Sequence, residues 1–471
     1  MLAFYGSNNS RCLLHITNKA LELRDTNPTF SRTEDLGKVE TLWRGQSDYP
    51  PSFYNLSDEG RNHLTLNLHP SPGGHVILAL YTEAFWLDVV RRRFSLVRET
   101  NRPYFYREAY LPDATAQSHA SNLLLLPNGD VLCAWFGGSM EGKPDISIYL
   151  SRLRSGEQSW SEATRMTHDN TRSEQNPVLF RTPTGDLWLL YTSQHAGNQD
   201  SAIVKHRISK DDGVTWGKEE VLFPDSGIFI RQPVIVLDDG AWVIPVFKCR
   251  VEPGERWLGN NDISCIRVSR DEGHTWTESI IPDSTGCVHM EIQRLKDRSY
   301  LGLFRSRWAD HIYLATSPDG LSWSPPRATV LPNPNAGICF DVLPSGRVVV
   351  VYNHSSKLDA TGRRQGLYDD IADGVDERRD QSSTQDGTES FWGAPRAPLC
   401  VAWSDDSGKT WERRVLEDGD GYCMTNNSEK KLNRELSYPS MVLDEGKIHI
   451  AYTFWRQRIK YVLLGDDFFS T

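Results

Sequence analysis

The sequence has no run of about 18 apolar residues, and its eight cysteines form no Cys-x-x-Cys pair. The first absence argues against a membrane-spanning helix, because such a helix needs about 20 apolar residues. The second argues against a zinc site and against a small disulfide framework. We therefore expect no membrane partner, and we predict neither a metal nor any other cofactor.

Clusters of positive charge are also lacking. The 471 residues include 52 Lys and Arg against 62 Asp and Glu, which gives a net charge of −10, and the basic residues are scattered. Proteins that capture nucleic acid by electrostatic attraction concentrate their basic residues in patches. We therefore expect no nucleic-acid partner.

The first fifteen residues lack the charged and then apolar stretches of a signal peptide. Localisation stays open, because a secreted protein whose signal peptide is not part of this sequence fits equally well. We expect the protein to act as a monomer.

What the sequence does contain is a repeated unit of an apolar strand, a short turn and a second apolar strand. Six copies cover residues 119–136, 176–192, 231–247, 289–304, 337–353 and 437–453, and a seventh candidate covers residues 63–82. Repeats at intervals of roughly 50–60 residues are typical of propeller blades. We therefore predict an all-β, seven-bladed β-propeller with four-stranded antiparallel blades, and a six-bladed propeller as the alternative.

The repeats also suggest a division of the chain. We expect residues 1–471 to form a single propeller domain in which residues 1–110 contribute the extra blade. A charged, glycine-containing insertion at residues 357–398 interrupts the repeats. We expect it to be a solvated loop, with a lid over the functional site as the alternative.

A second motif follows several of the hairpins. Its copies are SKDDGVTW (209–216), SRDEGHTW (269–276), SDDSGKTW (404–411) and the shorter SPDGLSW (317–323). They resemble the Asp-boxes of sialidases and related propellers. The aspartate can accept backbone N–H bonds within the turn and the glycine permits a positive φ, so we interpret these motifs as structural, not catalytic.

From residue 119 to residue 464 the order of hairpins and Asp-boxes is similar to that of the BNR-repeat, sialidase-like family. The resemblance implies a ligand site at one mouth of the central channel, where the innermost strand of each blade begins. The substrate-binding residues predicted at these strand starts are Asn176, Arg231, His289 and Glu291.

Three further residues are assigned by comparison with the family. Arg305 lies where the family carries an arginine that binds the substrate carboxylate, Tyr438 resembles the nucleophilic tyrosine, and Glu141 stands near the usual acid aspartate. In the first blade, however, the arginine of the Phe/Tyr-Arg-Ile-Pro motif is replaced by His119. A histidine cannot make the bidentate contact of a guanidinium with a carboxylate, which disfavours ordinary sialidase activity.

The first functional hypothesis is an exo-acting polysaccharide lyase that performs β-elimination at a glucuronate. With its His-for-Arg change and seven predicted blades, the chain resembles the L-rhamnose-α-1,4-D-glucuronate lyases. His119 would then act as the base and Tyr438 would protonate the leaving oxygen. Donors such as Asn176, Arg231 and Arg305 would neutralise the uronate carboxylate.

The alternative is an exo-α-sialidase or related exo-glycosidase that hydrolyses a terminal acidic sugar. Glu141 would be the general acid and Tyr438 the nucleophile, while Arg231 and Arg305 bind the sugar. A propeller that binds sugar without cleaving it is the third hypothesis. All three predict an acidic oligosaccharide or polysaccharide as the partner.

Overall fold

The computed structural model describes residues 2–5, 11–17, 20–25, 97–100, 102–364, 367, 378–419 and 434–470. The chain divides into two compact units, Met1–Arg91 and Arg92–Thr471. In the first unit, β1 (Leu2–Tyr5), β2 (Arg11–Thr17) and β3 (Ala20–Asp25) form an antiparallel sheet. The predicted hairpin at residues 63–82 lies outside the described residues.

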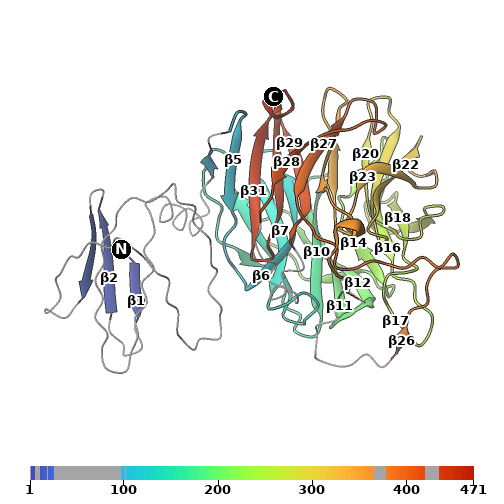
Figure 1. Cartoon of the computed structure of the whole chain (residues 1–471), viewed down its shortest axis with the longest axis horizontal. Coiled ribbons are helices and arrows are strands. Elements are labelled where there is room, and N and C mark those ends of the chain that lie inside the picture. Colours follow the sequence, from blue (N-terminus) through green and yellow to red (C-terminus); the bar gives the residue numbers. More distant parts are fainter. Residues whose placement is uncertain are drawn as a thin grey trace. The chain divides into compact units, whose positions relative to one another are not determined.

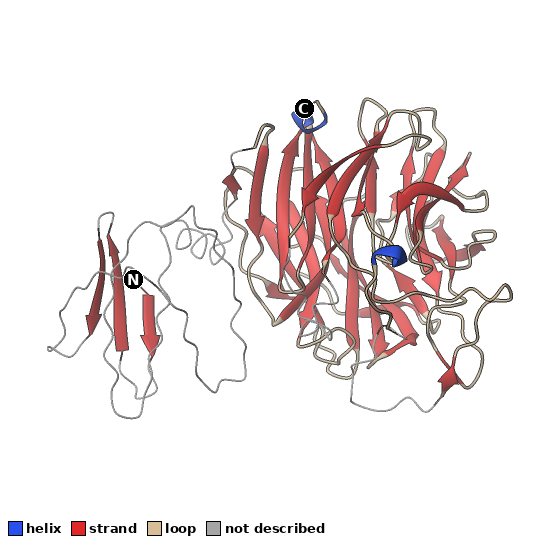
Figure 2. Ribbon diagram, viewed as in Figure 1, coloured by secondary structure: helices blue, strands red, loops and turns tan. Residues whose placement is uncertain are grey.

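The second unit is a ring of antiparallel sheets, and strands make up nearly all of its regular structure (Figures 1 and 2). Blade 1 contains β6 (Gln117–Leu125), β7 (Val131–Gly138), β8 (Ser147–Leu153) and β9 (Thr164–Arg165). Blade 2 contains β10 (Ser173–Arg181), β11 (Leu187–His195), β12 (Asn198–Ser209) and β13 (Glu220–Phe223). Blade 3 contains β14 (Ile228–Ile230), β15 (Ile235–Val236), β16 (Trp242–Lys248), β18 (Ile263–Ser269) and β19 (Thr277–Ile280).

Three more sheets complete the ring. Blade 4 contains β20 (Cys287–Arg294), β21 (Tyr300–Ser306), β22 (His311–Ser317) and β23 (Arg327–Pro332). Blade 5 contains β24 (Cys339–Val342), β25 (Val348–Asn353), β27 (Leu399–Ser404) and β28 (Glu412–Glu417). Blade 6 contains β29 (Leu436–Asp444), β30 (Lys447–Phe454), β31 (Arg458–Gly465), β5 (Tyr106–Tyr110) and β4 (Arg98–Glu99). Two short 3-10 helices, η2 (Lys357–Asp359) and η3 (Asp466–Phe469), lie outside the sheets.

The propeller formed by the described residues has six blades, so the all-β propeller of four-stranded antiparallel blades is confirmed and the number seven is wrong. The C-terminal segment supplies three strands to blade 6, so the fourth position, next to β31, must be filled from another part of the chain. Strand β5 fills this position by pairing with β31 in antiparallel fashion. Strands β4 and β5 therefore complete blade 6.

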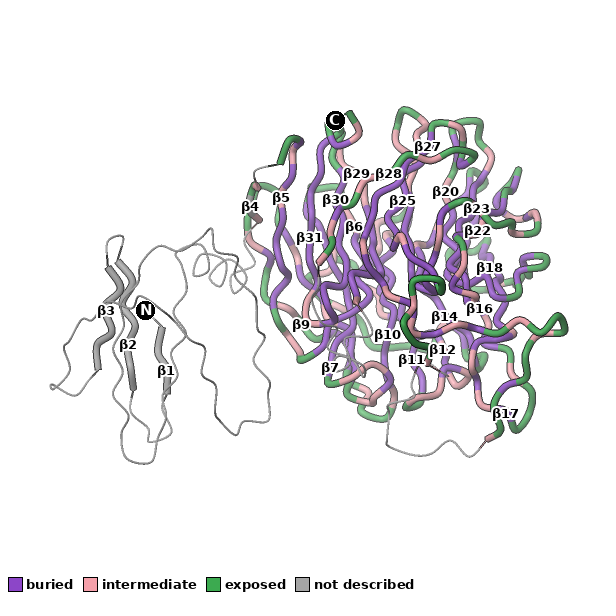
Figure 3. The backbone as a smooth tube through the Cα atoms, viewed as in Figure 1, coloured by how far each residue is buried: buried purple, intermediate pink, exposed green. Residues whose placement is uncertain are grey.

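Each blade packs against the next through its own apolar cluster among the described residues. Between blades 5 and 6, for example, Val351 and Trp403 pack with Tyr452. Burial of such clusters is the main favourable contribution to folding. Buried residues run along the strands and exposed residues gather in the loops at their ends (Figure 3). The described residues include no helix of the length and apolarity needed to cross a bilayer.

The Asp-boxes form the predicted local turns. In the copy at 209–216, Asp211 accepts the backbone N–H of Thr215 at 2.8 Å and the hydroxyl of Ser209 at 2.7 Å. Trp216 donates its indole N–H to the carbonyl of Gly213 at 3.2 Å, and Gly213 has a φ of 83°. The same bonds recur in the other three copies. The predicted hydrogen bonds and positive φ of these turns are confirmed.

The first strands of four blades contain a β-bulge at the same place. Each bulge includes a residue other than glycine at positive φ, namely Ala120 (57°), Asn176 (50°), His289 (51°) and Tyr438 (53°). Asn335, just before β24, has a φ of 56°. Bulges re-aim side chains, and backbone of this kind is frequent at functional sites. These first strands also border one another from blade to blade, so the bulges gather at the centre of the ring.

Lys460 secures the closure of the ring. Its ammonium group lies 3.0 Å from a carboxylate oxygen of Glu108 on β5 and also contacts Glu417 on β28, and Lys460 is 4% exposed. We expect Lys460→Met to destabilise the propeller by about 3–5 kcal/mol, because it leaves the buried Glu108 and the partly buried Glu417 without their cation. Urea denaturation followed by tryptophan fluorescence measures the change.

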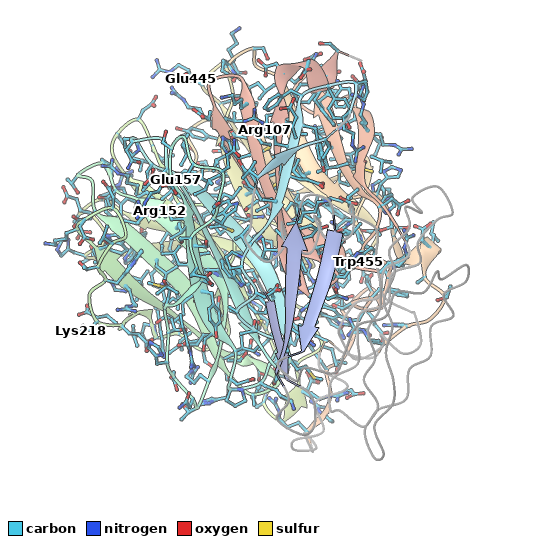
Figure 4. The ribbon with its side chains drawn as sticks, turned by 90° about the vertical axis from the view of Figure 1, so that its left-hand side faces the viewer. Arg107, Arg152, Glu157, Lys218, Glu445 and Trp455 are labelled. Carbon is cyan, nitrogen blue, oxygen red and sulfur yellow. The ribbon has the colours of Figure 1, made fainter. Side chains whose placement is uncertain are left out.

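The matched control is Lys218→Met. The Lys218 side chain is 85% exposed and is labelled on the surface in Figure 4. We expect this change to alter stability by less than about 0.5 kcal/mol. Equal effects of the two substitutions would show that Lys460 does not secure the closure.

Candidate functional site

Tyr438 lies at the centre of a group of buried polar residues where the first strands begin. The guanidinium carbons of three buried arginines, Arg231, Arg305 and Arg396, each lie 5.5 Å from the centroid of its ring. Arg305 donates a hydrogen bond to the hydroxyl of Tyr438. It is itself oriented by Asn335, whose side-chain oxygen accepts from its Nε at 2.7 Å.

Two histidines border the same tyrosine. The ring centroids of His119 and Tyr438 are 4.2 Å apart, and those of His289 and Tyr438 are 5.8 Å apart. Burial, reinforced by neighbouring arginines, holds the pKa of both histidines well below the usual value, so both are uncharged near neutral pH. Nδ1 of His119 is hydrogen bonded to the hydroxyl of Thr453 at 2.7 Å, and its Nε2 has no hydrogen-bond partner among the described residues.

Glu435 is a buried carboxylate that pairs with two buried arginines of this region, Arg396 and Arg456. It is fully buried, and one of its oxygens lies 2.8 Å from Nη1 of Arg396 and 3.0 Å from Nε of Arg456. The hydroxyl of Ser437 donates to the same oxygen at 2.7 Å. The two guanidinium groups outweigh burial and hold the pKa of Glu435 well below its usual value. Nε2 of His119 lies 3.8 Å from this carboxylate. We call Tyr438, His119, His289, Glu435 and the arginines 231, 305 and 396 the axis group.

The axis group and its neighbours carry more positive than negative charge. Five arginines here are at most 4% exposed: Arg231, Arg305, Arg307, Arg396 and Arg456. Three carboxylates pair with them: Glu435, Asp262 with Arg307, and Glu141 with Arg456. Burial raises the pKa of Glu291 well above the usual value, which disfavours a fourth negative charge here. The excess positive charge makes this end of the channel suited to an anionic ligand.

The insertion contributes directly to this region. Its strand β26 (Arg379–Asp380) pairs with β17 (Glu255–Arg256), which lies in the connection between β16 and β18 of blade 3. The side-chain oxygen of Gln381 accepts the backbone N–H groups of three successive residues, 258–260, at 3.0–3.1 Å. Further along, Trp392 is 1% exposed and stacks near Arg305, whose guanidinium carbon lies 5.9 Å from its ring. The described end of the insertion is thus packed against the propeller beside the axis group.

The structure brings together five of the predicted site residues: His119, Tyr438, Arg231, Arg305 and His289. The catalytic and binding roles assigned to them remain predictions. Arg231 reaches across the channel from blade 3 and donates to the carbonyls of Ser121 (3.0 Å) and Tyr438 (3.2 Å).

The other three predicted residues are not members of the axis group. Glu141 forms an ion pair with Arg456, which in turn pairs with Glu435 of the axis group. Glu291 accepts the backbone N–H of Phe340 at 3.0 Å, so it bridges blades 4 and 5. Asn176 occupies the bulge of β10, and its side-chain oxygen has no hydrogen-bond partner among the described residues.

Arg307, Arg396 and Arg456 were missed by the sequence reasoning. Arg396 stands near the end of the insertion, which the composition identified as a solvated loop. The available signal was local: Arg396 lies in APRAPL, an apolar and proline-containing stretch within otherwise charged sequence. Such flanks favour a buried segment.

One group of acidic residues in the described part of the chain has the spacing of metal ligands: Asp169, Glu174 and Glu219. The ammonium group of Lys205 lies among them, at 2.9, 3.3 and 2.8 Å from their oxygens. The lysine therefore already supplies a cation to these carboxylates.

We expect Glu435→Gln to destabilise the protein by about 3–5 kcal/mol at neutral pH, because the buried Arg396 loses its carboxylate and Arg456 loses one of its two. Because the pKa of Glu435 is lowered in the folded state, its contribution is present above the unfolded value of about 4.3 and is lost as the pH falls further. Urea denaturation should therefore show that the free energy of unfolding of the variant is lower than that of the wild type by a constant amount between about pH 5 and pH 8. This difference should become smaller below about pH 4. A difference that narrows already between pH 8 and pH 6 would assign the effect to another group.

Comparison with known proteins supports the fold. Among solved structures, a Hadza microbial sialidase is similar at 14% identity and a TM-score of 0.55, over 74% of this chain and 66% of its own. Trypanosoma rangeli sialidase in complex with the inhibitor DANA is similar at 11% identity and a TM-score of 0.53, over 79% of this chain and 58% of its own. A Dyadobacter fermentans protein of unknown function matches over 78% of this chain and 99% of its own, at 13% identity and a TM-score of 0.54.

At these identities the likeness shows the fold alone, and the chain spans less than two thirds of the length of the two sialidases. No curated protein matches the sequence. A family profile described as a BNR repeat-like domain, however, matches residues 129–450, which is more than half of the chain. The chain therefore belongs to the BNR repeat-like family.

Proposed function

We propose that this chain is a carbohydrate-active enzyme that cleaves a terminal sugar from an acidic glycan, with Tyr438 at the reaction centre. The observation that carries the proposal is the convergence of three buried arginines on this tyrosine within a region of excess positive charge. Guanidinium groups bind carboxylates through short, charge-assisted hydrogen bonds. An acidic sugar would thus be held with its carboxylate among the arginines and its glycosidic oxygen near the phenol.

The reaction that we propose first is β-elimination at a uronate. A base removes the proton from the carbon α to the carboxylate, the bond from the adjacent carbon to the glycosidic oxygen breaks, and a carbon–carbon double bond forms. His119 is uncharged and its Nε2 carries no hydrogen bond to a described residue, which suits the base. The hydroxyl of Tyr438, held by Arg305, would protonate the leaving oxygen.

Hydrolysis of a sialidase type is the second candidate, favoured by the contact between Arg305 and Tyr438. A tyrosine nucleophile needs a base next to its hydroxyl. Two buried glutamates are near enough to be considered for this role, but both have other partners. Glu291 accepts a backbone N–H from Phe340, and Glu435 is paired with two arginines. The residues present therefore fit elimination better than hydrolysis.

The choice of leaving sugar has weaker support. Six blades remove the architectural part of the resemblance to the seven-bladed L-rhamnose-α-1,4-D-glucuronate lyases, and only the His119 and Tyr438 pair still supports it. Rhamnose stays a proposal.

Offering the protein a rhamnosyl-glucuronate glycan and a sialoside separately tests the reaction type. We expect the first to give an unsaturated uronate, which is detected by its ultraviolet absorbance, and the second to stay intact. Release of sialic acid without unsaturation would replace elimination by hydrolysis. No product from either substrate, together with measurable binding, would indicate a sugar-binding propeller.

A substitution tests the base. We expect His119→Ala to lower kcat by about 100-fold to 10,000-fold, which is the usual contribution of general base catalysis. The control is His168→Ala, since His168 is an exposed histidine outside the axis group, and we expect it to keep full activity. Near-normal turnover by a folded His119→Ala protein would remove His119 from the base role.

A further inference from the structure

A hollow opens on the same face of the propeller as the axis group. Asn353, at the end of β25, pairs with Leu399, at the beginning of β27. This end of blade 5 is also the end at which the first strand, β24, begins. The hollow lies beside this pair and has a volume of about 310 Å³. That is room for about ten water molecules, enough for one sugar ring. Asp359, the last residue of the 3-10 helix η2, is one of the residues that line it.

Two hydrogen-bonded segments, residues 395–397 and 434–436, separate the hollow from the axis group, and we call them the wall. The N–H of Arg396 donates to the carbonyl of Arg434 at 2.7 Å, and the N–H of Leu436 donates to the carbonyl of Arg396 at 2.8 Å. Pro395, Ala397 and Arg434 line the hollow. Arg396 and Glu435, which alternate with them along the two segments, form the buried ion pair of the axis group. One face of the wall therefore carries the hollow and the other face carries the proposed reaction centre.

The wall is held in place from blade 5. The side-chain amide of Asn353 donates to the carbonyls of Arg396 at 2.9 Å and Leu436 at 2.7 Å. Asn353 is fully buried. The shape of the hollow is thus fixed by the same contacts that fix the axis group.

The chemistry of the lining differs from that of the axis group. Pro395, Ala397 and Pro398 supply an apolar surface, while His354 and Thr361 supply polar atoms. Three ionisable residues also line the hollow: Arg434, Asp359 and His354. The first two have polar partners, and the third is uncharged. Arg434 pairs with Asp418. Asp359 accepts the N–H of Ser356 at 2.8 Å. Burial lowers the pKa of His354, which is therefore neutral near pH 7.

We infer that the hollow binds a neutral sugar unit of the glycan whose acidic sugar binds at the axis group. An apolar surface next to a few polar atoms matches the C–H face and the hydroxyl groups of a pyranose ring. The inference rests on the proposed function for the identity of the glycan. The hollow determines which sugar the enzyme accepts beyond the acidic one.

Thr361→Trp tests the inference, because Thr361 is exposed and an indole there would fill the hollow without altering the axis group. The matched control is Leu358→Trp, which adds the same side chain at a position that is 89% exposed and is not among the residues of the lining. Saturation-transfer NMR with neutral methyl glycosides of glucose, galactose and rhamnose at millimolar concentration measures binding without any need for turnover. We expect the wild type and Leu358→Trp to bind at least one glycoside and Thr361→Trp to bind it at least about tenfold more weakly.

Kinetics provide the second readout. We expect Thr361→Trp to raise KM at least about tenfold for a long acidic glycan, while an acidic disaccharide is cleaved as by the wild type. Lack of cleavage by the wild type, with NMR binding that Thr361→Trp abolishes, would reject the proposed function and keep a neutral-sugar site. Absence of glycoside binding to the wild type, or equal binding by the two tryptophan variants, would overturn the inference.

Discussion

Burying five guanidinium groups at one end of a propeller is the constraint on which the rest of this region depends. An unpaired buried charge is very costly, so each arginine must have partners that are themselves fixed. Glu435 forms ion pairs with both Arg396 and Arg456, and Asp262 forms one with Arg307. Arg231 relies on main-chain carbonyls from blades 1 and 6. The carbonyls can be positioned this way only if the ring is closed.

The ring also explains why the polar residues meet. In four of the six blades, the bulge in the first strand turns one side chain out of the regular pleat. The sequence can then vary that position, using Asn176 in blade 2, His289 in blade 4 and Tyr438 in blade 6, without changing the fold. Fold and reaction chemistry are therefore specified by different residues, as is usual for widely used folds.

The hairpins and the Asp-boxes were predictable because their signals are local. The number of blades was not, because closure depends on the pairing of β5 with β31, which no local pattern records. Within the candidate site, His119 and Tyr438 were found because they begin recognisable strands. Glu291 follows the bulge that contains His289, and the changed register directs it toward Phe340 instead of the tyrosine. Arg396 was hidden by the composition of the insertion around it.

The pairing of β5 with β31 also orders events in time. About 350 residues separate these two strands, and a ribosome adds about 5–20 residues per second. Strand β5 therefore leaves the ribosome tens of seconds before its partner exists. During that interval its hydrogen-bonding edge is available to other strands, which is the kind of exposure that chaperones cover. Blade 6 can therefore be completed only after β31, one of the last strands to be synthesised, has left the ribosome.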